Sequence, residues 1–158
     1  MSGMAPTHPR VLADLGRALS LELTAVQQYL TQAVLVELWG DSQAAERFRR
    51  ETVEEMQHAE RLVKRMISLG VAPGASQLQP ASHASDLHGL LLLNQDLEAR
   101  LVAHYAEAMA LCQRIGDAEN AAFFLDLWRE EQQHGEALAA WLDSLRTPAV
   151  PPLLRATV

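Results

Sequence analysis

Apolar side chains recur every three or four positions along four long segments of this sequence, which is the period of an amphipathic helix. Strand signals are lacking, because β-branched and aromatic residues are sparse while Ala, Leu, Glu, Gln and Arg dominate. Capping residues and glycines mark the ends of the segments. The pattern predicts four helices, over about residues 11–39, 41–70, 85–116 and 117–146.

The segment VAPGASQLQPASHAS, between the second and third helices, is too long for a tight turn. It is long enough to run along a helical bundle and to join two antiparallel hairpins. We therefore predict an all-α fold, a four-helix bundle with one long crossover between the second and third helices, which is the ferritin-like arrangement. The predicted division is an N-terminal extension over residues 1–10, the bundle over 11–146 and a proline-rich tail over 147–158.

Ionisable side chains occupy positions where the apolar seams of the helices would continue with leucine. They are Glu22 on the first helix, Glu55 and His58 on the second, Glu98 on the third, and Glu131 and His134 on the fourth. Burying unpaired charges costs several kcal/mol per ion, so we expect something to neutralise them. Two divalent cations would balance four carboxylates beside two neutral imidazoles. This donor set suits iron or manganese and does not choose between them.

The spacing of these residues supports a two-metal site built by two halves of the chain. In Glu-x-x-His the two side chains share one helix face, so one helix can offer a bridging carboxylate and a terminal imidazole. Two such motifs alone are weak evidence, because thirteen glutamates and six histidines produce about half a motif by chance. However, the separation of Glu22 from Glu55 along the chain equals the separation of Glu98 from Glu131. We therefore expect a repeat in which each half supplies half a site.

Composition narrows the functions that these helices can have. The 158 residues include 13 Lys and Arg against 20 Asp and Glu, a net charge of -7, so a phosphate backbone has no basic surface to bind. A single cysteine, Cys112, excludes an internal disulfide and a cysteine-only metal site. No apolar run is long enough for a membrane span or a signal peptide. We expect a cytoplasmic protein with no nucleic-acid or membrane partner.

The segments around the six residues resemble those of bacterioferritins, over about residues 12–145. They read ELTAVQQY at Glu22, ETVEEMQHAERLVKRM at Glu55 and His58, DLEARLVAHYAEA at Glu98, and REEQQHGEALAAWL at Glu131 and His134. The resemblance implies a ferroxidase centre in which these six side chains bind two irons per subunit, with Glu55 and Glu131 as the bridging ligands. It further implies oxidation of Fe(II) to Fe(III) by oxygen or peroxide, and storage of iron in a hollow shell of twenty-four subunits.

Two more residues gain a role from the resemblance. Met56 follows Glu55 by one position and so points about 100° away from the metal seam. Bacterioferritins place there a methionine that binds a haem b shared between two subunits. Packing at a helix interface is the alternative for Met56, since methionine is an adaptable filler. Tyr29, on the face of Glu22, would bond to a metal ligand or donate an electron, and the alternative is a packed tyrosine with a satisfied hydroxyl.

The sequence also departs from the family, which keeps another function open. TPAVPPLLRATV stands in place of the short fifth helix that lines the fourfold channels of the shell, and its prolines are incompatible with a helix interior. The shell is therefore less supported than the metal site. The alternatives are a small dimeric di-metal oxidase or peroxidase without mineral storage, and a metal-free helical interaction module. The other histidines lack an acid three positions earlier, and we expect them at the surface or in loops: His8, His83, His88 and His104.

Overall fold

The computed structural model describes residues 5–146, which form four long helices and no strand. The helices are α1 (Pro9–Leu38), α2 (Ser42–Ser68), α3 (Leu87–Ile115) and α4 (Ala118–Arg146). The prediction of an all-α four-helix bundle is confirmed. None of the four helices is both long and apolar enough to cross a membrane. The proline-rich tail predicted over 147–158 lies outside the described residues.

The helix ends follow local chemistry. Asp41 and Asp86 cap α2 and α3 with side-chain oxygens that accept backbone N–H groups of the first turn, as their positions predict. The start of α1 differs from the prediction, because Pro9 lies inside the helix instead of before it. Proline suits the first turn, where its missing N–H would have no helical partner. His8 takes the cap position, and its Nδ1 accepts the N–H of Arg10 at 3.1 Å.

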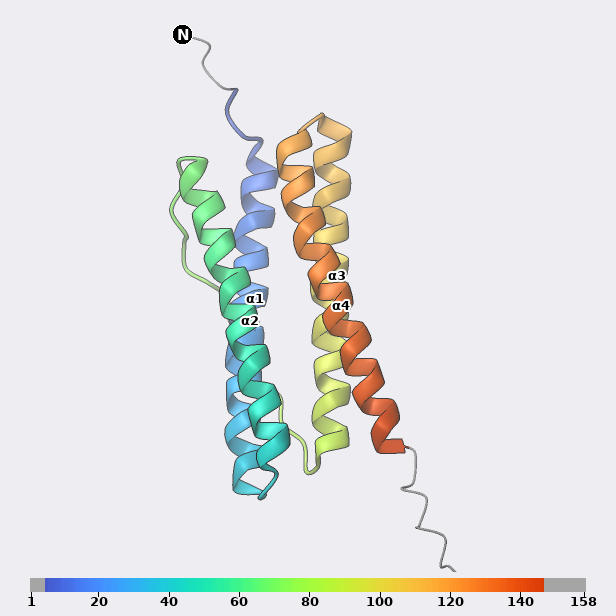
Figure 1. Cartoon of the computed structure of the whole chain (residues 1–158). Helices are drawn as coiled ribbons and strands as arrows, with labels where there is room; N and C mark the ends of the chain where they lie inside the picture. Colours follow the sequence, from blue (N-terminus) through green and yellow to red (C-terminus); the bar gives the residue numbers. More distant parts are fainter. Residues whose placement is uncertain (1–4, 147–158) are drawn as a thin grey trace, which may run out of the picture.

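The chain forms two antiparallel hairpins that lie side by side, α1 with α2 and α3 with α4 (Figure 1). Gly116 ends α3 in the left-handed region, at a φ of 76°, and lets α4 begin two residues later. The crossover from α2 to α3 runs back along the bundle. There the backbone N–H of Gln77 donates to the Ser20 hydroxyl at 3.0 Å. The predicted crossover is confirmed.

The interior between the hairpins is apolar towards the helix ends and polar in the middle. Large apolar side chains that are fully buried include Leu15, Phe48, Leu62, Leu91, Leu101, Phe124 and Leu127. Three buried amides join α1 to α3: Asn94 Oδ1 accepts from Gln28 and from Gln32, each at 2.8 Å, and Asn94 Nδ2 donates to Gln32 at 2.7 Å. These amides are paired with one another, as buried polar groups usually are. Several oxygens of the carboxylates beside them have no hydrogen bond.

Candidate metal centre

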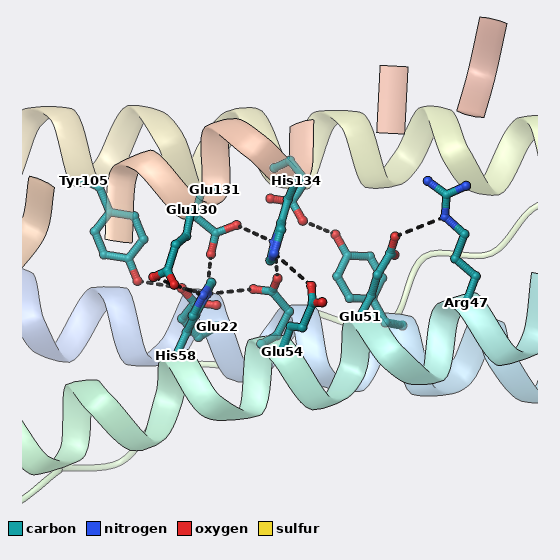
Figure 2. A network of polar contacts seen from close by, with 12 residues as sticks. Glu22, Arg47, Glu51, Glu54, His58, Tyr105, Glu130, Glu131 and His134 are labelled. Atoms are coloured by element: carbon teal, nitrogen blue, oxygen red, sulfur yellow. Dashed lines mark hydrogen bonds and ion pairs between the residues drawn. The ribbon is translucent and has the colours of Figure 1, made fainter. Parts of the chain in front are cut away.

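The six predicted ligands come together in the middle of the bundle, although they lie on four helices. Two groups of donor atoms form there, each with all its atoms within 4.8 Å of one another. One group comprises Glu22, Glu55, His58 and Glu131, and the other comprises Glu55, Glu98, Glu131 and His134. Glu55 and Glu131 therefore belong to both groups. Figure 2 shows the two histidines side by side, with carboxylates on both sides of them.

Helical geometry places these residues without special backbone conformations. Residues three apart lie one above the other on a helix, so each Glu-x-x-His presents both side chains to the same interior. The φ angles of the described non-glycine residues are all negative. Each carboxylate is almost completely buried. The imidazoles differ: the His58 side chain is 5% exposed, whereas the His134 side chain is 21% exposed.

Both imidazoles turn Nδ1 towards the carboxylates. His58 Nδ1 lies 2.8 Å from Glu131 Oε1 and 3.4 Å from Glu22 Oε1. His134 Nδ1 lies 2.7 Å from Glu55 Oε1 and 3.4 Å from Glu131 Oε2. The rings are nearly parallel, with centroids 5.4 Å apart. Each Nδ1 thus faces the shared interior, where a metal ligand would have to face.

Many buried donor atoms of this cluster have no hydrogen-bond partner within the protein. They are Glu22 Oε2, Glu55 Oε1 and Oε2, Glu98 Oε2, Glu131 Oε2 and His134 Nδ1, of which Glu55 Oε1 and His134 Nδ1 form an ion pair with each other but no hydrogen bond. Leaving a buried polar atom unpaired costs about 1–3 kcal/mol, and more for a charged group. These atoms belong to five of the six predicted ligands. The donor set therefore fits two cations, which would satisfy the atoms that the protein leaves unpaired.

The pKa values describe how the protein neutralises this charge with protons. Burial raises the pKa of Glu55 to about 8, helped by the charge of Glu22, and burial raises the pKa of Glu131 to about 7. Burial alone would also raise the pKa of Glu22, but contacts with Glu55 and His58 outweigh it and lower that pKa to about 2. Burial would lower the pKa of His134, yet its contacts with Glu131 and Glu55 raise it to about 11.

His58 behaves in the same way. Burial favours its neutral form, but Glu131 and Glu22 outweigh burial and raise its pKa well above the ordinary value. Protons on both imidazoles and on part of the carboxylates therefore balance the cluster when no cation is bound. Cation binding would displace these protons.

Two buried tyrosines hold the terminal carboxylates, which are Glu22 and Glu98, the two that belong to only one donor group each. Each tyrosine comes from the opposite hairpin. The Tyr29 hydroxyl on α1 donates to Glu98 on α3, and the Tyr105 hydroxyl on α3 donates to Glu22 on α1 at 2.6 Å. Tyr29 thus bonds to one of the proposed ligands, which agrees both with the expected bond to a metal ligand and with a packed tyrosine whose hydroxyl is satisfied. Tyr105 is not among the residues predicted from the sequence, although it stands as far after Tyr29 in the chain as Glu131 stands after Glu55.

We call this constant separation in the chain, between a residue of the first hairpin and its counterpart in the second, the hairpin offset. Glu54 and Glu130, a further pair not predicted from the sequence, are separated by the same offset. His134 Nε2 lies 2.9 Å from Glu54 Oε2, and His58 Nε2 lies 3.6 Å from Glu130 Oε2 (Figure 2). Each histidine is therefore flanked on its outer edge by a carboxylate of the opposite hairpin. Such partners orient metal-binding histidines and raise their basicity.

Two residues named from the sequence lie away from this cluster. Met56 is 49% exposed on α2, so it does not fill the core of the subunit. His104 was expected at the surface, and that expectation is wrong: it is buried on α3, and its Nε2 lies 2.9 Å from the Asp14 carbonyl oxygen of α1. Whether a side chain of α3 is buried depends on the helix face it occupies, and not on whether an acid stands three positions earlier in the chain.

Comparison with known proteins gives a consistent result. Residues 12–147 match the family model described as a ferritin-like domain. The chain is 32% identical to a bacterioferritin of Brucella melitensis, with 87% of this chain and 86% of that protein covered. It is 31% identical to a bacterioferritin of Rhodobacter capsulatus, with 82% and 80% covered.

Among solved structures, the chain is similar to a bacterioferritin of Rhodobacter capsulatus, with a TM-score of 0.85 and 28% identity. The alignment covers 90% of this chain and 89% of that one. That structure is described as having a metal-free dinuclear site and a heme iron in a crystallographic special position.

Proposed function

The chain belongs to the ferritin-like family, with bacterioferritins at about 30% identity among its relatives, and on that premise we propose that it is a ferroxidase for iron storage and detoxification. Its substrate would be Fe(II), bound as a pair at the centre that the two hairpins build. The product would be Fe(III), and oxygen or peroxide would accept the electrons.

The observation that carries this proposal is the set of unpaired donor atoms inside the bundle. A protein that used these carboxylates only for structure would pair them, as it pairs the neighbouring amides of Gln28, Gln32 and Asn94. Instead, both carboxylate oxygens of Glu55 are buried without a hydrogen bond, and Oε1 forms only an ion pair with His134 Nδ1, another proposed ligand, at 2.7 Å. Glu55 and Glu131, which belong to both donor groups, would bridge two cations.

The remaining ligands complete two similar cation positions. Glu22 and His58 would complete one position, and Glu98 and His134 would complete the other. Four carboxylates neutralise two divalent cations, and two neutral imidazoles leave that balance unchanged. Tyr29 and Tyr105 fix the terminal carboxylates from the opposite hairpin, so both positions are formed only where the hairpins meet.

A pair of bound Fe(II) ions supplies two electrons, which with two protons reduce one oxygen to hydrogen peroxide or one peroxide to two waters. The protein's own contribution is to collect the ions, keep the site dry and move protons. The imidazoles and carboxylates that hold protons in the metal-free site release them when the cations bind, because metal ligands must be deprotonated. Tyr29, bonded to Glu98, is the proposed additional electron donor beside this pair.

The test is the initial rate of Fe(II) oxidation, followed by the near-ultraviolet absorbance of Fe(III). We expect Glu55→Ala and Glu131→Ala each to lower the rate to that of autoxidation in buffer, because each removes a bridging ligand. Glu60→Ala is the matched control on α2, since Glu60 is exposed and outside both donor groups. Oxidation at the wild-type rate in both bridging variants, with helicity retained, would exclude the ferroxidase.

Storage inside a shell is the second part of the proposal, and the particle mass tests it. A particle of several hundred kilodaltons that retains iron supports a shell of about twenty-four 17.4 kDa subunits. A dimer that oxidises Fe(II) would instead support the small oxidase or peroxidase without mineral storage. A cytoplasmic location and the absence of nucleic-acid partners stay predictions from the sequence.

We also propose that Met56 binds haem b at an interface between two subunits. Met56 and Val53 are both half exposed and lie one turn apart on α2, which presents an apolar face with a free thioether. One chain offers one such sulfur on this face, so Met56 of each of two subunits would hold the haem together. Haem-reconstituted protein should show a Soret band that Met56→Leu removes and Met109→Leu retains. An unchanged band in Met56→Leu would refute this role.

A further inference from the structure

The di-metal cluster repeats itself after one hairpin offset, but its surroundings do not. All six proposed ligands, both tyrosines and the Glu54 and Glu130 pair follow this offset. Arg61 breaks it, because the corresponding position on α4 is Ala137, an exposed residue with no charge. A charged residue that lacks a counterpart lies beside one half of the site only. The two halves of this centre are therefore not equivalent.

Arg61 acts on the half that contains His58. Its Nη1 forms an ion pair with Glu130 Oε2 across the seam between α2 and α4. The same Glu130 oxygen faces His58 Nε2 at 3.6 Å. One carboxylate thus lies between a guanidinium and an imidazole, over the outer edge of the His58 ring. This arrangement agrees with the 5% exposure of the His58 side chain.

The half that contains His134 has no such cover. His134 Nε2 lies 2.9 Å from Glu54 Oε2, and no arginine or lysine in residues 5–146 pairs with Glu54. Glu54 itself is half exposed, and the His134 side chain is clearly more exposed than that of His58. Water and a chelator therefore reach the His134 half more easily than the His58 half.

We propose that Arg61 is a positioning residue that holds Glu130 over His58, and that it slows cation loss from the His58 half, so that exchange runs through the His134 half. This inference rests on the proposed two-metal centre. The reason is geometric: a carboxylate that Arg61 holds over the ring keeps the imidazole from turning away from the interior, and losing such an outer partner costs about 10- to 100-fold in metal affinity. An exposed ion pair contributes little to folding stability, so its effect should appear in exchange rather than in unfolding.

The experiment measures Co²⁺ release from protein loaded with two equivalents per chain, by the loss of visible Co²⁺ absorbance after mixing with excess EDTA. We expect two phases in the wild type. Arg61→Met should accelerate the slow phase by roughly 10- to 100-fold and leave the fast phase unchanged. Glu130→Gln should do the same. The double variant should release Co²⁺ no faster than either single variant, because both single variants remove the same contact between Arg61 and Glu130.

Arg65→Met is the matched control, since Arg65 also ties α2 to α4, with its Nε donating to Asn120 Oδ1 at 2.8 Å, but does not contact His58. It should leave both phases unchanged. A slow phase that Arg61→Met does not alter, or that Arg65→Met accelerates equally, would overturn the positioning role, and so would a single phase in the wild type. Wild-type protein that binds no Co²⁺ would instead refute the proposed metal centre itself. If Arg61→Met fails to fold, Glu130→Gln carries the same test.

Discussion

Metal-free protein should lose stability as the pH rises from 7 to 9, because its folded state holds protons that the unfolded state has released. The pKa of His134 is about 11 in the folded state, against 6.5 for an ordinary histidine. Between these values the folded state binds more protons, so the free energy of unfolding falls as the pH rises. The raised pKa of His58 acts in the same direction.

The carboxylates also contribute to the dependence of the free energy of unfolding on pH, each over its own pH range. The pKa of Glu55, about 8, and that of Glu131, about 7, also favour the folded state at low pH, and their contributions fade between pH 4.5 and those values. The lowered pKa of Glu22 acts in the opposite direction, but only between pH 4.5 and about 2. From pH 7 to about 8 Glu55 therefore steepens the fall that the imidazoles cause, and the pKa of Glu98, raised by burial, acts in the same direction.

The size of the effect follows from the number of protons held. Each proton that only the folded state binds changes the free energy of unfolding by about 1.4 kcal/mol per pH unit. The two imidazoles contribute at most about 2.7 kcal/mol per pH unit, and solvent at the partly exposed His134 lowers its share. Glu55 adds to this slope up to about pH 8. Against a typical total of about 5–15 kcal/mol, such a slope is easily measured.

The assay is urea unfolding followed by far-ultraviolet circular dichroism at pH 7, 8 and 9, at one protein concentration and with a chelator present. His58→Gln should lose about one proton's share of the slope, whereas the exposed His83→Gln should keep the wild-type slope. Zn²⁺, added in place of the chelator, should flatten the wild-type curve, because the cation displaces the protons. A flat or rising curve in the metal-free wild type would refute this account of the site's charge.

Three further predictions concern proton release from the site, the bond of Tyr105 to Glu22 and the cap of α3. Loading the apoprotein with Co²⁺ at pH 7 should release protons, measured with a pH indicator, and no release would mean that the site is not protonated when empty. Tyr105→Phe should weaken Co²⁺ binding about 10- to 100-fold, because it removes the 2.6 Å bond that holds Glu22, and an unchanged Kd would contradict a role for Tyr105. Asp86→Ala should lower the free energy of unfolding by about 1 kcal/mol, because it removes the cap of α3, and a change below about 0.3 kcal/mol would show that the cap is replaceable.

The sequence predicted the helices and the six clustered side chains well, because both depend on local periodicity. An acid on an apolar seam must lie inside the bundle, and four such acids beside two histidines must meet. The predicted start of α1, at about residue 11, comes two residues after the observed one, because proline fits a first helical turn. His104 was misplaced because the absence of an acidic partner says nothing about burial.

The contacts around the ligands needed the structure. The bond from Tyr105 to Glu22 and the contact of Glu54 with His134 join different hairpins, and their distances depend on how the hairpins pack. The hairpin offset could have suggested both pairs. It could not have suggested Arg61, which has no counterpart in the other half and whose ion pair with Glu130 depends on the spacing of α2 and α4.

Neither hairpin carries a complete cation position by itself. The group with His58 takes Glu131 from the other hairpin, and the group with His134 takes Glu55 in return. Each bound ion would therefore act as a cross-link between the two halves of the chain, and stripping the ions would leave only protons on the imidazoles and carboxylates to hold that boundary together. Iron loading and hairpin docking are one linked equilibrium, so starvation for metal should separate the halves before either helical pair unwinds.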